Sequence, residues 1–263
     1  MVRILVSVLV SSLVVSGCVS QPPIATTSAE GPVSQRAVVG DATQRARAHV
    51  DLGFSYLQAN KLDIALSEAK IAIESDPSYP LGYNLQGLVQ MYLNENRAAE
   101  QSFSRALQLA PGDPEISNNF GWFLCLAGRE RAALPYFEAA AGNPLYLTPT
   151  KPLTNAAMCL IGVKDDQGGE DFLLRALKAD PKNYDAQFVL AGLYYRSGRL
   201  LEAKQQLDER HRHVDPTAQS AWLGLRLERK LGDREAEQRY NIIIRRNFPR
   251  SREHDLLMQG NFE

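Results

Sequence analysis

The sequence has few of the residues that most often carry chemistry. It contains three cysteines, four histidines and two tryptophans among 263 residues. Its formal net charge is −1, from 29 basic and 30 acidic side chains. Without an excess of one sign, no long-range field recruits nucleic acid or an anionic membrane surface. We therefore expect no nucleic-acid partner.

Motifs for catalysis, nucleotide binding and metal binding are also missing. The sequence has no phosphate-binding loop, dinucleotide fingerprint or nucleophile elbow. His211 and His213 make a poor metal pair, because positions i and i+2 do not share a helix face. The carboxylates of "DDQGGED" (165–171) lack the calcium-loop spacing. We expect no enzyme, metal, cofactor or small-molecule substrate.

The apolar run over residues 4–15 is too short for a comfortable membrane span and suits a signal peptide. It follows Arg3 and ends in small residues before Cys18, which resembles the lipobox of bacterial lipoproteins. The resemblance implies a signal peptide at 1–17, cleavage before Cys18, and lipid on its sulfur and on the new amino group. The alternative is a plain signal peptide with an incidental cysteine.

Two or more acyl chains, such as palmitate, would anchor the chain stably at a membrane. Cys18 is followed by Val19 and Ser20 rather than by aspartate, which in Gram-negative lipoproteins commonly retains the protein at the inner membrane. We therefore expect an outer-membrane lipoprotein that faces the periplasm. Residues 18–43, rich in Ser, Thr, Pro, Gly and Ala, are predicted to form the lipidated N-terminus and a flexible linker.

The rest of the chain shows a repeat in its small residues. A glycine inside a helix costs about 1 kcal/mol relative to alanine, so its regular return indicates a close approach between helices. Residues spaced by 34 positions are Gly53, Gly87 and Gly121; Ala65, Ala99 and Ala133; and Ala72, Ala106 and Ala140.

This period resembles the tetratricopeptide repeat, a helix–turn–helix unit. The resemblance implies an all-α fold, a right-handed α-solenoid of six repeats over residues 44–250, followed by a tail at 251–263. The repeats are placed near 46–79, 80–113, 114–147, 150–183, 184–217 and 217–250. The pattern departs from the repeat in three places: a two-residue slip at Thr148, Gly169 in place of an alanine, and Arg210 in place of another alanine.

Two cysteines remain after the lipobox. Cys125 and Cys159 both fall late in the first helix of neighbouring repeats, and such helices pack side by side. A disulfide is therefore feasible, and an oxidising compartment favours it. The alternative is a pair of buried free thiols.

The first helices of repeats one to three carry apolar residues at positions that normally face the inner groove of such a solenoid. This pattern predicts an apolar groove for an extended or helical peptide. The alternative is that the register is shifted and several of these residues belong to the core. The candidates are Val50, Phe54, Leu57, Leu88, Met91, Tyr92, Trp122 and Leu126.

Two stretches resemble one family more specifically. "NNFGWFLCLAGRERAALPYFEAAAGNPLYLTP" (118–149) and "WLGLRLERKLGDREAEQRYNIIIRRNFPRS" (222–251) look like the type IV pilus biogenesis lipoproteins PilF and PilW. That family combines a lipobox with six tetratricopeptide repeats. The sequence departs from the family pattern at "GGEDFLLRAL" in the fourth repeat, where an alanine usually opens the helix.

The family resemblance implies a pilotin, a protein that helps the pilus secretin reach the outer membrane and assemble its multimer through protein binding in the groove. The alternative is a general periplasmic scaffold of the same architecture, which gathers peptidoglycan enzymes or outer-membrane assembly factors.

Overall fold

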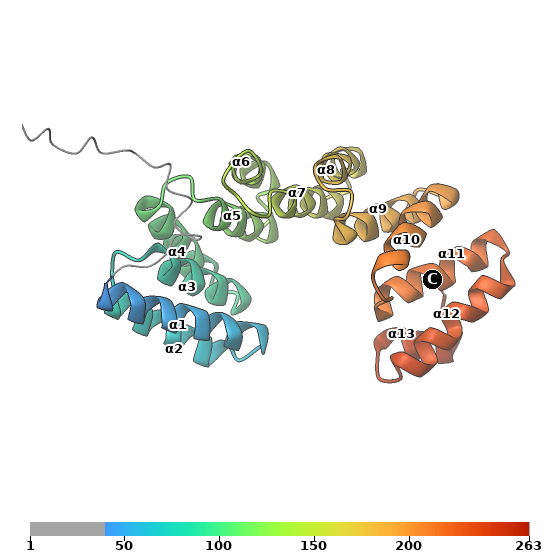
Figure 1. Cartoon of the computed structure of the whole chain (residues 1–263), viewed down its shortest axis with the longest axis horizontal. Helices are drawn as coiled ribbons and strands as arrows, with labels where there is room; N and C mark the ends of the chain where they lie inside the picture. Colours follow the sequence, from blue (N-terminus) through green and yellow to red (C-terminus); the bar gives the residue numbers. More distant parts are fainter. Residues whose placement is uncertain (1–39, 263) are drawn as a thin grey trace, which may run out of the picture. The chain divides into compact units, whose positions relative to one another are not determined.

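The computed structural model describes residues 40–262, and every regular element in that range is an α-helix. The helices follow one another in pairs along the chain (Figure 1). Within the described range, no helix has the length and apolar character that a membrane crossing requires. The bounds are α1 (Asp41–Gln58), α2 (Leu62–Ser75), α3 (Pro80–Tyr92), α4 (Asn96–Leu109), α5 (Pro114–Leu126), α6 (Glu130–Ala141), α7 (Thr150–Gly162), α8 (Asp166–Ala179), α9 (Tyr184–Arg196), α10 (Leu200–His213), α11 (Ala218–Leu231), α12 (Arg234–Asn247) and α13 (Arg252–Gln259).

Each odd-numbered helix up to α11 packs against the helix that follows it, and we call the two helix A and helix B of a repeat. Each helix B also packs against the next helix A, and successive A helices contact one another directly. The A helices therefore form one continuous layer. The predicted all-α solenoid of helix–turn–helix repeats is confirmed.

One residue with a left-handed backbone ends helix A in every repeat. Such a residue lets the chain reverse into helix B, while its own N–H and that of the next residue donate to the last carbonyls of helix A. Lys164 takes this conformation with φ of 65° although it lacks the freedom of glycine, at a cost of about 1 kcal/mol. The six residues are Asn60, Asn94, Gly128, Lys164, Gly198 and Gly232.

The recurring glycines face aromatic rings of their own helix B. A Cβ atom on Gly121 would lie 3.0 Å from the ring of Phe137, which is fully buried. The same pairing brings each of three glycines against a ring sixteen residues later. The pairs are Gly87 with Phe103, Gly121 with Phe137, and Gly224 with Tyr240.

In two repeats the A–B contact is filled by a different pair of residues. In repeats four and five the glycine is replaced by Ala157 or Ala191, and the aromatic ring by Leu173 or Leu207. All four side chains lie in one buried cluster. The A–B contact therefore conserves total volume, with a small residue opposite a large one. Gly53 is different, because its space is taken by Leu85 from the next helix A.

The fourth repeat is displaced by the segment between α6 and α7. Tyr146 of this segment is buried, and its hydroxyl donates to Glu115 Oε2 at 2.5 Å. Burial raises the pKa of Tyr146, and the hydrogen bond to Glu115 raises it further. Lys151 Nζ donates to the other oxygen of Glu115 at 2.6 Å, so one carboxylate ties the segment and the start of α7 to α5.

Gly169 in the fourth repeat also has a structural reason. A Cβ atom there would lie 2.5 Å from Ile161 Cγ1 and 3.2 Å from the Ala157 carbonyl oxygen, so the side chain of an alanine would clash.

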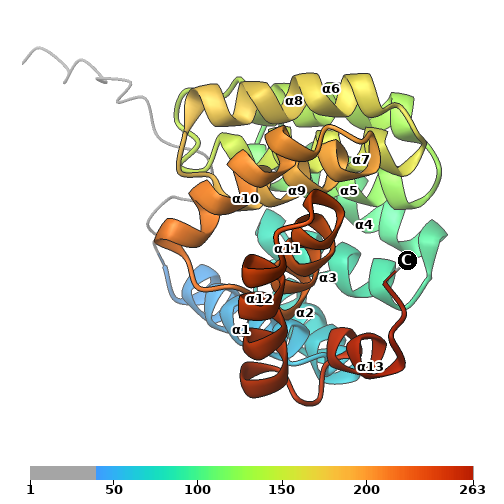
Figure 2. The same cartoon turned by 90° about the vertical axis from the view of Figure 1, so that its right-hand side faces the viewer.

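At both ends of the solenoid, helices extend beyond the boundaries predicted from the sequence. Helix α1 begins at Asp41, inside the stretch predicted as linker, because Thr43 Oγ1 donates to Asp76 Oδ2 at 2.6 Å and ties this turn to the end of α2. At the other end, α13 packs against α11 and α12 (Figure 2), and Leu257 is buried there. The tail at 251–263 therefore includes a helix that covers the last repeat.

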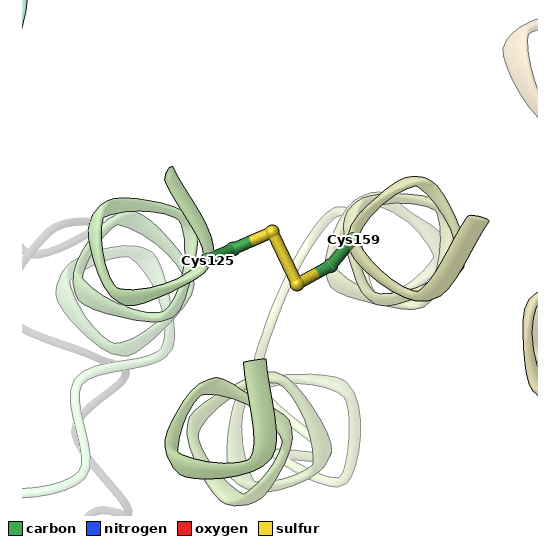
Figure 3. The surroundings of a disulfide bond; sticks show 2 residues. All are labelled: Cys125 and Cys159. Carbon is green, nitrogen blue, oxygen red and sulfur yellow. A yellow bond between two sulfur atoms is a disulfide. The ribbon is translucent and has the colours of Figure 1, made fainter. Parts of the chain in front are cut away.

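A disulfide joins the A helices of repeats three and four (Figure 3). Cys125 on α5 and Cys159 on α7 have Cα atoms 5.7 Å apart, within the usual range for a disulfide. The bond bridges the two sides of the inserted segment between α6 and α7. It therefore holds together the one repeat junction at which the 34-residue register slips.

The glycine pairing predicts opposite effects at two glycines in A helices. Gly224→Ala should lower the free energy of unfolding by about 1–3 kcal/mol, because its methyl group overlaps the Tyr240 ring. Gly192→Ala should raise it by about 0.5–1 kcal/mol, because no atom lies within 4 Å of the added Cβ and alanine favours the helix. Urea unfolding checks both. Equal effects at the two positions would contradict the pairing.

The disulfide should stabilise the native chain. Replacing both Cys125 and Cys159 by serine should lower the free energy of unfolding by about 2–4 kcal/mol, because the unfolded chain regains the freedom of the closed loop. Intact-mass measurement should show the wild type two mass units lighter than its reduced form. Native protein in which both thiols react with a labelling reagent would refute the bond.

Candidate functional site

The A helices present a polar ladder of asparagines along their shared layer. Asn155 on α7 donates to Asn118 Oδ1 at 2.8 Å, and Asn118 donates to Asn119 Oδ1 at 3.2 Å on the same helix α5. Asn119 then donates to Asn84 Oδ1 on α3, also at 3.2 Å. These hydrogen bonds fix the register of three successive A helices. Asn84, Asn118 and Asn119 are buried, and Asn84 Nδ2 has no hydrogen-bond partner.

The predicted groove residues of repeats one to three separate into three groups. Val50, Leu88 and Met91 are buried in the core, so their assignment to an open groove is wrong. Phe54, Leu57 and Trp122 are half-buried against the same core clusters. Tyr92 and Leu126 are 55% and 59% exposed and remain open to a partner.

The direct packing of A helices explains the buried group. Phe54 and Leu57 of α1 pack against the cluster that contains Leu88 and Met91 of α3. A side chain that would face a groove if the A helices stood apart instead fills the junction between two of them. The exposed residues Tyr92 and Leu126 end their helices and occupy corresponding positions in α3 and α5.

Two cavities on the A-helix layer lie in repeats four to six. The first, of about 690 Å³, lies between α7 and α9 and reaches Arg210 at the end of α10. The second, of about 380 Å³, lies between α9 and α11 and includes Gly192 and Trp222. Phe188 and Val189 of α9 line both cavities.

A polar cluster joins α10, α11 and α12 beside the first cavity. His211 forms hydrogen bonds to Ser220 Oγ at 2.9 Å and to the Tyr240 hydroxyl at 3.0 Å. Arg210 Nη1 donates to the same Ser220 oxygen at 3.4 Å. Burial lowers the pKa of His211 to about 4, and the neighbouring charge of Arg210 adds to this shift. His211 is therefore neutral at physiological pH.

Sequence reasoning did not assign a role to Arg210, Gly192 or the asparagines. One signal was present, since Arg210 stands where earlier repeats carry Ala72, Ala106 and Ala140. Asn84 and Asn118 also lie 34 residues apart, the period of the repeat, which could have indicated a shared position on successive A helices. Which asparagines bond to one another depends on the rotation of each A helix.

The predicted lipidation site, Cys18, and the signal peptide at 1–17 lie outside the described residues. Within residues 40–262 no three His, Cys, Asp or Glu side chains are grouped closely enough to hold a metal ion.

The buried His211 predicts a loss of stability in acid. Between pH 6.5 and about 4 the unfolded chain binds a proton at His211 that the folded chain excludes, so stability falls as pH falls through this window. The loss should be on the order of 2 kcal/mol. His211→Gln should flatten the dependence. Urea unfolding at several pH values checks this, and an unchanged slope in the variant would contradict it.

The sequence and the fold resemble known proteins over most of the described chain. The chain is 24% identical over 207 residues to the type IV pilus assembly protein PilF of Pseudomonas aeruginosa, covering 79% of this chain and 82% of PilF. The crystal structure of PilW, a widely conserved type IV pilus biogenesis factor, superposes with a TM-score of 0.69 at 28% identity. That match covers 81% of this chain and 98% of PilW.

A second solved structure, that of PilF from Pseudomonas aeruginosa, superposes with a TM-score of 0.67 at 22% identity and covers 83% of this chain and 99% of PilF. The pattern of the tetratricopeptide repeat matches residues 50–114, 84–146 and 170–221. The matched segments contain helices α2 to α6 and the pair α9 and α10 in full. The chain thus belongs to the tetratricopeptide repeat family and is homologous to the pilus biogenesis proteins PilF and PilW.

Proposed function

We propose that the chain is a pilotin of type IV pilus biogenesis, an outer-membrane lipoprotein that binds the pilus secretin and promotes its localisation and multimer assembly. The observation that carries this proposal is the similarity to PilW, at 28% identity over 98% of PilW. That homology supports a role in pilus biogenesis, and the pilotin activity is our more specific proposal.

Lipid anchoring at Cys18 would allow even weak binding of the secretin to be effective. Acyl chains on Cys18 would hold the solenoid at the inner leaflet of the outer membrane, facing the periplasm. Holding scaffold and secretin at one membrane raises their effective concentration, so a micromolar affinity, about −8 kcal/mol, is sufficient. No catalytic step is needed.

The exposed apolar side chains of repeats two and three are where we place secretin contact. Tyr92 and Leu126 end neighbouring A helices, and the half-buried Trp122 lies one turn from Leu126 on α5. Large exposed apolar residues grouped in this way mark protein-interaction sites.

Replacing Leu126 by glutamate should reduce secretin multimers and twitching at least about tenfold, because a carboxylate would have to be desolvated in the contact. The matched control is Leu201→Glu on α10, which is 74% exposed on a B helix. Immunoblots of unheated envelope measure the multimers. Normal multimers in Leu126→Glu cells, or equal loss in the control, would remove this contact from the proposal.

The anchor has a separate test. Cys18→Ser should release the chain from the outer membrane and leave secretin monomers in the inner membrane. Membrane fractionation measures both proteins, and outer-membrane retention of the variant would end the lipoprotein assignment. Co-purification decides the function class, since recovery of peptidoglycan hydrolases or barrel-assembly proteins without secretin would favour the general scaffold.

A further inference from the structure

The cavity between α7 and α9 contains a buried cation without an anionic partner. Arg210 is 6% exposed, and no carboxylate among residues 40–262 forms an ion pair with it. Its Nε has no hydrogen-bond partner, and its Nη1 bond to Ser220 Oγ is long, at 3.4 Å. Burying an unpaired charge is strongly unfavourable. The chain accepts this cost at a position where repeats one to three carry alanine.

The charged side chains that line this cavity have both signs. Lys151 and Lys182 line the cavity together with Arg210, and Lys151 is paired with Glu115. The Asn155 amide group already donates to Asn118 in the asparagine ladder. Two carboxylates, Asp180 and Asp185, line the same cavity, and Asp180 accepts a hydrogen bond from the Lys182 backbone. Neither aspartate pairs with Arg210.

The adjoining cavity provides an apolar floor. Gly192 sits inside α9, where a glycine is less favourable than an alanine, yet nothing lies within 4 Å of the Cβ that another residue would have. Packing inside the chain therefore does not explain this glycine. The floor continues through Phe188 and Val189 to Met158, which is 41% exposed in the first cavity.

An aromatic side chain near the end of the chain, Phe262, already packs on Trp222. Phe262 stacks on Trp222 with ring centroids 5.7 Å apart, and the guanidinium of Arg229 lies 3.8 Å from the centre of the Phe262 ring. Trp222 also lines the second cavity. Next to it, Arg226 lies over the Tyr195 ring at 4.9 Å, and its buried Nε has no partner. Stacking between an aromatic plane and a guanidinium is favourable when both are desolvated.

We propose that the two joined cavities of repeats four to six form a peptide site that recognises an acidic residue close to an aromatic one in an extended protein segment. The carboxylate forms a charge-assisted bond with the Arg210 guanidinium, and the aromatic ring lies over Gly192 and against Trp222. The inference rests on the proposed function in taking the ligand to be a protein segment. It uses different residues from the secretin contact at Tyr92 and Leu126.

The test uses the full lipidated chain in detergent and fluorescein-labelled nine-residue peptides of Gly and Ser. Each peptide carries one Asp and one Phe, separated by zero to four residues. A matched set carries Asn in place of Asp. At least one Asp peptide should bind about tenfold more tightly than its Asn counterpart, measured by fluorescence anisotropy. Equal binding by the two sets, or no binding by any peptide, would overturn the proposal.

Two variants locate the site. Arg210→Ala restores the alanine of the earlier repeats and should fold, but it should abolish the preference for Asp over Asn. Gly192→Leu should block the Phe and weaken binding at least about tenfold, whereas Leu201→Glu should bind normally. Circular dichroism establishes folding. An Arg210 with only a structural role would lower stability when replaced and leave the Asp preference intact, which would refute the site.

The two proposals can fail separately. If the peptides do not bind while Leu126→Glu still disrupts secretin multimers, the peptide site is wrong and the pilotin function stands. If the peptides bind while secretin assembles normally without this chain, the pilotin function is wrong and the site serves another protein.

Discussion

The contact between helix A and helix B of each repeat is the constraint on which the fold depends. In repeats two to six a small residue on helix A faces a large one on helix B, and the sum of the two volumes stays nearly constant. Gly121 with Phe137 and Ala191 with Leu207 are two solutions of the same problem. Because close-packed interiors leave few voids, neither member can change alone without a cavity or a clash. Glycine is therefore retained within a helix despite its cost.

The close approach of helix A and helix B lets successive A helices contact one another as a layer. The asparagine ladder aligns α3, α5 and α7, and the disulfide between α5 and α7 holds the junction where the register slips. In repeats one to three the layer closes over most of its apolar residues. In repeats four to six it leaves two cavities, and the departures from the repeat pattern gather there. Sites where a sequence departs from its repeat pattern or from helix preference are often functional. Arg210 and Gly192 are two such sites.

Much of the architecture could be predicted from the sequence, because glycine and alanine spacing encodes the helix contacts directly. The period placed Gly87, Gly121 and Gly224 against their helix B. It did not reveal that Gly53 faces Leu85 of the next repeat, because that contact depends on how two repeats stack. The groove was predicted less well. Val50, Leu88 and Met91 have the same apolar character in a core as in a groove, and only the packing of neighbouring A helices decides between the two.

The central claim is that in repeats two to six the facing residues sixteen positions apart share one fixed volume, and a double-mutant cycle tests it most directly. Gly121→Ala and Phe137→Leu would be made singly and together, with the free energy of unfolding measured by urea. The account predicts that Gly121→Ala destabilises the wild type but is neutral or stabilising once Phe137 is leucine, with a coupling of at least about 1 kcal/mol. Additive effects would show that the two side chains do not share the space, and would contradict the account.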